Sequence, residues 1–106
     1  MTPEKFTDIL NEMQSQCIKL LSQKEEEYSD GVDRLIQFKQ AAALRGVSTL
    51  EALSGMMVKH TTKLYSMISA EDKSKVHGAD AWEEVLNDHA NYLTLTKAVL
   101  IDEGMI

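Results

Sequence analysis

Apolar residues recur at spacings of three and four along most of this chain, and this periodicity restricts its fold more than any other feature. Such spacing places apolar side chains on one face of an α-helix, where they are expected to be buried. No segment alternates apolar and polar residues over a useful length, as a half-buried strand does. The sequence therefore predicts an all-α fold. The longest apolar stripe lies near the N-terminus and consists of Phe6, Ile9, Leu10, Met13, Cys17, Leu20, Leu21 and Tyr28.

Turn and cap signals divide the chain into separate helices. Thr2 followed by Pro3 is typical of a helix start. The segments 48–51 and 80–83 have the spacing of a capping box, in which a short polar residue precedes a glutamate by three positions. The polar segment 69–78 is expected to be a loop. These signals predict one domain that spans residues 1–106, built as a four-helix bundle with helices near 3–29, 32–45, 49–69 and 80–103.

Three features favour a homo-oligomer, most simply a dimer. The alanines at 41–43 allow another helix to approach closely, and methionines at 56, 57 and 67 suit an adaptable apolar surface. A chain of 106 residues also buries only part of its surface when it folds alone. Assembly hides more apolar area, so we expect more than one copy in the functional protein.

The balance of charge argues against several classes of partner. The net charge of −6 disfavours binding to DNA, RNA or an anionic membrane, since each of these requires a basic face. It leaves room for a small anionic ligand held in a local basic pocket. No apolar run is long enough for a membrane helix, and the first residues do not resemble a signal peptide. A single cysteine, Cys17, fits a reducing compartment, so we expect a cytoplasmic protein.

Basic and polar residues on the third and fourth helices are candidates for a binding site. Lys59 and Lys63 are four residues apart and project together, with His60 beside them at the margin of the apolar stripe. Two ammonium groups and an imidazole suit a phosphate, although exposed lysines beside a border histidine explain the pattern as well. Asp88 shares its helix face with apolar residues and with Tyr92. A carboxylate there is costly to bury unless it is paired.

Carboxylates near the end of the first helix and on the fourth helix are candidates for holding a cation. Glu26 and Asp33 approach one face if the helix continues that far, and Glu84 lies four residues before Asp88. Clustered carboxylates repel one another unless a cation or a basic group lies between them. A charged helix end that faces solvent accounts for the first group equally well.

Four short fragments, taken in their order along the chain, resemble a family of small helical proteins. These fragments are Lys24-x-x-Glu27-Tyr28-Ser29, Asp33-Arg34-Leu35-x-x-Phe38-Lys39-x-Ala41-Ala42, Met57-x-Lys59-His60 and Asp88-x-x-Asn91-Tyr92-Leu93. Together they are similar to the MazG-like all-α nucleoside-triphosphate pyrophosphohydrolases and to the nucleotide-modification-associated helical domains common in bacteriophage genomes. The resemblance implies an oligomeric helical bundle that handles nucleotides inside a bacterial host.

The resemblance also implies a magnesium site, and here the sequence departs from the pattern. MazG-like enzymes hold magnesium with an E-x-x-E pair and an E-x-x-D pair on two helices. Only Glu84 and Asp88 could supply the second pair, and they are one residue too far apart. The first pair has no clean match, since Glu27 with Asp30 is E-x-x-D. This departure weighs more against metal-dependent hydrolysis than against nucleotide binding.

The interpretation that we favour from the sequence is a phage-type protein that binds a small nucleotide without cleaving it. Such a protein could sequester a host nucleotide signal and so act against a defence system. One alternative is a magnesium-dependent pyrophosphohydrolase, with Glu26, Glu27, Asp33, Glu84 and Asp88 as metal ligands. A second is an acidic inhibitor that binds a host protein. On the favoured interpretation, the ligand-binding residues are Lys24, Tyr28, Arg34, Lys59, His60, Lys63, Asp88, Asn91 and Tyr92.

Overall fold

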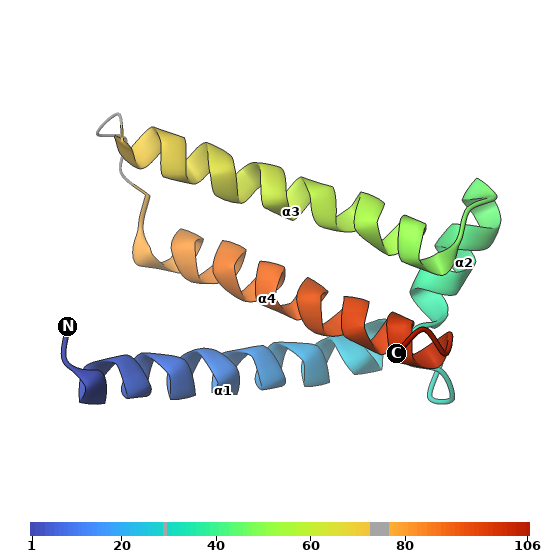
Figure 1. Ribbon diagram of the computed structural model, residues 1–106, viewed down its shortest axis with the longest axis horizontal. Helices are drawn as coiled ribbons and strands as arrows, with labels where there is room; N and C mark the ends of the chain where they lie inside the picture. Colours follow the sequence, from blue (N-terminus) through green and yellow to red (C-terminus); the bar gives the residue numbers. More distant parts are fainter. Residues whose placement is uncertain (29, 73–76) are drawn as a thin grey trace.

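The computed structural model describes residues 1–28, 30–72 and 77–106, and within them the only regular elements are four α-helices. The predicted all-α fold is therefore confirmed for the described part of the chain (Figure 1). None of the helices in these ranges combines the length and apolar character that a membrane span requires. The helices are α1 (Pro3–Tyr28), α2 (Ile36–Arg45), α3 (Thr49–Asp72) and α4 (Ala79–Asp102).

Several helix ends form as their local sequence predicts. The Thr2 hydroxyl oxygen accepts a hydrogen bond of 3.1 Å from the Lys5 backbone N–H, which caps α1. Ser48 caps α3 in the same way by accepting from the Glu51 N–H at 3.1 Å. Gly46 ends α2 with a φ of 67°, a left-handed conformation that glycine adopts at low cost.

The second helix begins four residues later than predicted, because aspartates hold the preceding segment in a turn. The carboxylate of Asp30 accepts hydrogen bonds from the N–H groups of Val32 and Asp33 at 2.9 and 2.7 Å. Asp33 then accepts from the Leu35 N–H at 2.9 Å. Side chains that bond to nearby backbone groups compete with helix formation, so α2 begins at Ile36.

Two further boundaries differ from the prediction. The helix α3 continues through Asp72, so the expected loop of 69–78 is shorter at its start, and residues 73–76 lie outside the described residues. The N-cap of α4 is Gly78, which places Asp80 in the first turn of the helix and not at its cap. A carboxylate in the first turn still interacts favourably with the positive end of the helix dipole.

The long helices are arranged around α4. Helices α3 and α4 lie side by side and antiparallel, α1 lies along the other side of α4, and α2 crosses the end where α3 begins (Figure 1). The loop before α2 supplies one core residue, and the rest of the described core comes from α2, α3 and α4. It consists of Leu35, Phe38, Ala42, Ala52, Leu53, Met67, Val85 and Val99.

The prediction that α1 buries its whole apolar stripe is wrong in this structure. Phe6, Ile9 and Leu10 are exposed, whereas Met13 and Cys17 are half-buried against α4. Periodicity shows which face of a helix is apolar, but it does not show how far along that face a partner helix extends. The side chain of Tyr28, which ends the stripe, lies outside the described residues.

Candidate functional site

A polar cavity of about 200 Å³ lies where α1, α2, α3 and α4 approach one another. Lys24 projects into it from α1, Arg34 from the loop before α2, and His60 from α3. The fourth helix contributes residues one turn apart, so that their side chains point to the same side. These are Asp88, Asn91, Tyr92 and Leu95, and the remaining lining residues are Leu21, Gln37 and Phe38.

Asp88 has two basic partners in this cavity. Its carboxylate lies 3.6 Å from the Lys24 ammonium and 3.8 Å from Nδ1 of His60, and its side chain is only 18% exposed. The sequence showed that a carboxylate on this face requires a partner, and the structure supplies one from α1 and one from α3. Removing an opposite charge from such a site leaves the remaining charge uncompensated.

His60 combines an electrostatic role with a ring contact. Burial lowers the pKa of this imidazole below its usual 6.5, and the nearby Asp88 carboxylate opposes that shift. The positive charges of Lys59 and Lys24 lower the pKa of His60 further. The imidazole is therefore neutral at pH 7. Its ring lies 4.8 Å from the Tyr92 ring, centroid to centroid, at an interplanar angle of 35°.

Asn91 is buried at this cavity without a hydrogen-bond partner. Its side chain is 3% exposed, and within the described residues neither the amide nitrogen nor the amide oxygen is bonded. Leaving a buried donor or acceptor unpaired costs about 1–3 kcal/mol. A side chain that carries this cost in a folded protein requires an explanation, and a ligand that pairs with the amide is one.

The cavity is more positive than the chain as a whole. Lys24 and Arg34 contribute +2 and Asp88 contributes −1, which gives a formal charge of +1 with His60 neutral. The net charge of the complete chain is −6. An anion is therefore attracted to this position and repelled by much of the remaining surface.

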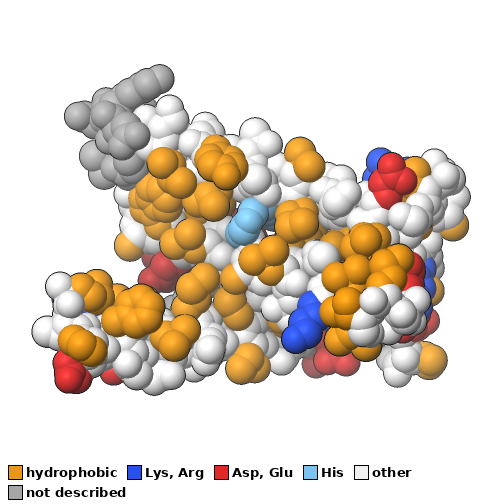
Figure 2. All heavy atoms as spheres, in the orientation of Figure 1, with side chains coloured by type: hydrophobic (Ala, Val, Ile, Leu, Met, Phe, Trp, Pro, Cys, Tyr) orange, Lys and Arg blue, Asp and Glu red, His pale blue; other side chains and the backbone are white. Residues whose placement is uncertain are grey.

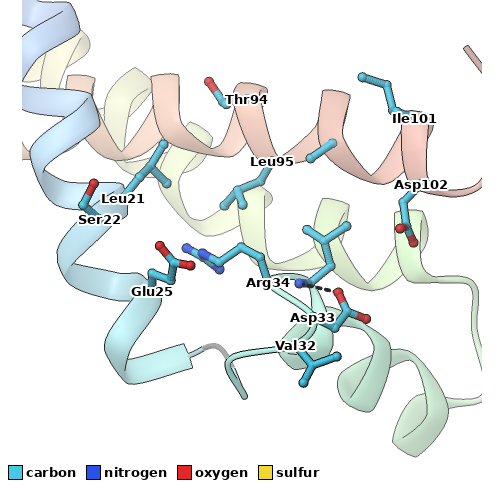
Figure 3. A pocket seen from close by; sticks show the side chains of 12 residues that line it. Leu21, Ser22, Glu25, Val32, Asp33, Arg34, Thr94, Leu95, Ile101 and Asp102 are labelled. Carbon is cyan, nitrogen blue, oxygen red and sulfur yellow. Dashed lines mark hydrogen bonds between the residues drawn. The ribbon is translucent and has the colours of Figure 1, made fainter.

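A second cavity of about 610 Å³ adjoins the polar one and shares Leu21, Arg34 and Leu95 with it. Figure 3 shows Arg34 extending from the loop toward the last turns of α1, on the side where Glu25 lies. Apolar side chains make up much of the wall, including Val32 and Ile101 (Figure 3). A side chain that borders both cavities can contact two parts of one ligand.

Lys39 fixes the loop that carries Arg34. Its ammonium donates a hydrogen bond to the Asp33 carboxylate in that loop and lies 3.0 Å from the Asp102 carboxylate at the end of α4. These contacts raise the pKa of Lys39, and the hydrogen bond from Lys39 lowers the pKa of Asp33. Asp33 thus ties the loop to α2 and, through Lys39, to α4.

Six of the nine ligand-binding residues predicted from the sequence line the polar cavity, two do not, and the side chain of the ninth lies outside the described residues. Lys59 and Lys63 are exposed on α3 and line neither of the two cavities. The side chain of Tyr28 is outside the described residues. The six that come together are Lys24, Arg34, His60, Asp88, Asn91 and Tyr92.

The five carboxylates predicted for a metal site are dispersed. Glu26, Glu27 and Glu84 are exposed, Asp33 pairs with Lys39, and Asp88 pairs with Lys24. Within residues 1–28, 30–72 and 77–106, no three side chains of His, Cys, Asp or Glu are grouped so that they could hold a metal ion. Of these five, only Asp88 lines the polar cavity.

One polar residue of the cavity was missed by the sequence interpretation. Gln37 lines the cavity from the first turn of α2, next to the core residue Phe38. A glutamine at a helix start is ordinary on a solvated face, so its residue type gives no signal. Its position relative to Arg34, three residues before it, was the only available clue.

Comparisons of this chain with known protein families, with curated proteins and with solved structures found no match.

Proposed function

We propose that this protein binds a small phosphate-bearing nucleotide in the polar cavity where the four helices approach one another and does not hydrolyse it. The observation that carries the proposal is the amide of Asn91, which is buried there beside two cationic side chains and has no hydrogen-bond partner among the described residues. An asparagine amide offers one donor group and one acceptor, as the edge of a nucleobase does. Lys24 and Arg34 supply the charge that a phosphate requires.

The roles of the remaining residues follow from their positions. Lys24 and Arg34 pair with phosphate oxygens, and neutral His60 donates one hydrogen bond from its ring. The polar cavity alone, at about 200 Å³, is smaller than typical ligand sites of about 300–1,000 Å³. The adjoining cavity of about 610 Å³ provides the additional room for a sugar and base. Arg34 borders both cavities and orients the ligand across them.

Binding without hydrolysis is favoured over the pyrophosphohydrolase alternative by the dispersed carboxylates. Magnesium-dependent hydrolysis requires several oxygen ligands around one or two ions. Among the described residues, the one carboxylate that lines the polar cavity is Asp88, and it is already paired with Lys24. The resemblance to helical proteins of bacteriophages supports a role in sequestering a host nucleotide signal. The acidic exterior is the feature that supports the other alternative, an inhibitor of a host protein.

A nucleotide panel tests the proposal directly. Nucleoside mono-, di- and triphosphates and cyclic nucleotides are screened by thermal shift with and without magnesium, and those that raise the Tm are titrated calorimetrically. A ligand that binds only the native state must raise the Tm. We expect at least one nucleotide to bind in the absence of magnesium and no pyrophosphate to be released in its presence.

Matched variants locate the binding site. A charge-assisted hydrogen bond is worth about 1.5–3 kcal/mol, so Lys24→Gln should weaken nucleotide binding by about ten- to a hundredfold. The control is Lys63→Gln, which removes an exposed lysine that lines neither cavity and should leave the affinity within about twofold. Equal affinities for both variants, or no binding by the wild type, would refute the proposal. Magnesium-dependent release of pyrophosphate would support the enzyme in its place.

A further inference from the structure

We propose that the first half of α1 packs against the same segment of a second copy of this chain, forming a two-fold symmetric pair. Phe6, Ile9 and Leu10 lie on one face of the helix and are 59%, 43% and 47% exposed. In Figure 2 hydrophobic side chains gather over this end of α1, and no other described helix lies over them. An exposed apolar patch on a small protein marks a contact surface.

A groove extends this apolar face toward α4. It has a volume of about 240 Å³, and its apolar lining comes from Ile9 and Met13 of α1 and from Leu86 of α4. A side chain that projects from a second copy can enter the groove while its helix covers the exposed face. The patch and the groove therefore form one surface, which we call the α1 face, made up of Phe6, Ile9, Leu10, Met13 and Leu86.

The burial of α1 is too small for a helix of its length. Its 26 residues contribute none of the fully buried side chains of the described core. Helices in proteins are stabilised mainly by tertiary packing of their apolar face, because formation of an isolated helix is only marginally favourable in water. A second copy supplies that packing along the half of α1 that the chain itself leaves open.

The dimensions of the chain agree with this inference. Its accessible surface is 7394 Å², whereas a folded monomer of its mass exposes about 5,900 Å². Its radius of gyration is 16.0 Å, against about 13 Å for a compact domain of this length. A stable interface buries roughly 800 Å² on each partner. The accessible surface of this chain therefore exceeds that of an average folded monomer by more than the area that one partner buries in a stable interface.

Charge specifies an antiparallel arrangement of the two helices. Lys5 and Glu12 are seven residues apart, so they lie on the same flank of the α1 face. In an antiparallel pair related by a two-fold axis, this flank faces the same flank of the second copy. Lys5 of each copy then approaches Glu12 of the other copy, which gives two contacts between opposite charges. In a parallel pair it faces the opposite flank, where Thr7 and Gln14 carry no charge.

Sedimentation equilibrium and light scattering at micromolar concentration measure the molecular mass and so test whether two copies associate. Two copies of 11.9 kDa give 23.8 kDa, and we expect this mass for the wild type. Phe6→Glu and Leu10→Glu replace side chains that are exposed in the single chain, so the fold should be retained by circular dichroism while the mass falls to 11.9 kDa. Leu44→Glu is the control, because Leu44 is 89% exposed on α2, away from the α1 face, and this variant should keep the mass of the wild type.

A charge exchange tests the arrangement of the helices. Lys5→Glu places like charges together at both ends of an antiparallel pair and should weaken the association several-fold at low salt. Combining it with Glu12→Lys restores opposite charges and should restore the association. A wild type of 11.9 kDa, or an assembly that Phe6→Glu and Leu10→Glu leave intact, would overturn the proposal. Association unaffected by Lys5→Glu would overturn the antiparallel arrangement. The variant that tests nucleotide binding, Lys24→Gln, changes a residue in the second half of α1 that lies outside the α1 face. The two proposals are therefore tested independently.

Discussion

Replacing Asn91 by leucine should make the protein more stable and abolish its binding of nucleotide. The amide of Asn91 is buried, and neither of its polar atoms has a hydrogen-bond partner among the described residues. Each unsatisfied buried group costs about 1–3 kcal/mol, and an apolar side chain of similar branching removes that cost. The neighbouring cavity of about 200 Å³ has room for the slightly larger leucine, so overpacking is avoided.

We therefore expect Asn91→Leu to raise the free energy of unfolding by about 1–3 kcal/mol. For a domain of this size, 1 kcal/mol corresponds to roughly 4 °C in Tm. Urea denaturation followed by circular dichroism, at one fixed protein concentration, measures the change. The slope of the free energy against urea should be unchanged, because the substitution alters neither fold nor compactness.

The matched control is Asn87→Leu, one turn earlier on the same helix. Asn87 is buried to a similar degree, but its amide nitrogen donates a hydrogen bond of 2.8 Å to the Gln16 side-chain oxygen on α1. Asn87→Leu removes this hydrogen bond and the contact that Asn87 Oδ1 accepts from the Cys17 thiol, so it should destabilise the protein by about 1 kcal/mol. If Asn91→Leu is as destabilising as Asn87→Leu, the Asn91 amide is satisfied in the folded protein and the reasoning fails.

Two further predictions concern the charges around Asp88. Asp88→Asn raises the formal charge of the polar cavity from +1 to +2. We therefore expect calorimetry at low salt to show an affinity for nucleotide that is several-fold higher than that of the wild type. A lower affinity would contradict the charges assigned to the cavity. Because burial lowers the pKa of His60 below 6.5, the unfolded chain binds this proton more readily than the folded protein does. Stability should consequently fall as the pH drops below about 6.5 and level off beneath the folded pKa. Urea denaturation midpoints measured between about pH 5 and 7.5 test this expectation. The loss of stability at low pH should be smaller in His60→Asn than in the wild type, and an unchanged pH profile would show that His60 is not its source.

The helices themselves could be predicted because their signals are local. A helix depends on contacts between residues three and four apart, and the caps at Thr2 and Ser48 act within one turn. Where the predicted start of α2 was wrong, side chains had bonded to nearby backbone N–H groups. Asp30 and Asp33 do this before α2, and residue type alone does not show whether an aspartate near a glycine continues a helix or ends it.

The candidate site could be predicted only in part. Burial of Asp88 on an apolar face required a basic partner, and this requirement is visible in the sequence. Residue spacing did not identify that partner, and in the structure Asp88 lies beside Lys24 of α1, which is remote in the chain, and beside His60 of α3. Residue spacing fixes which side chains share a helix face, but the placement of one helix against another decides which faces meet.

The sequence by itself therefore determined the all-α class, most of the helix ends and the need to pair Asp88. Tertiary structure decided that α1 packs along α4, and this packing brought Lys24 to Asp88 and set the unpaired amide of Asn91 beside them. It also left Phe6, Ile9 and Leu10 exposed on the first half of α1. The reason is that apolar periodicity specifies a face that must be covered, while the covering element is chosen by shape and by the lengths of the connecting loops.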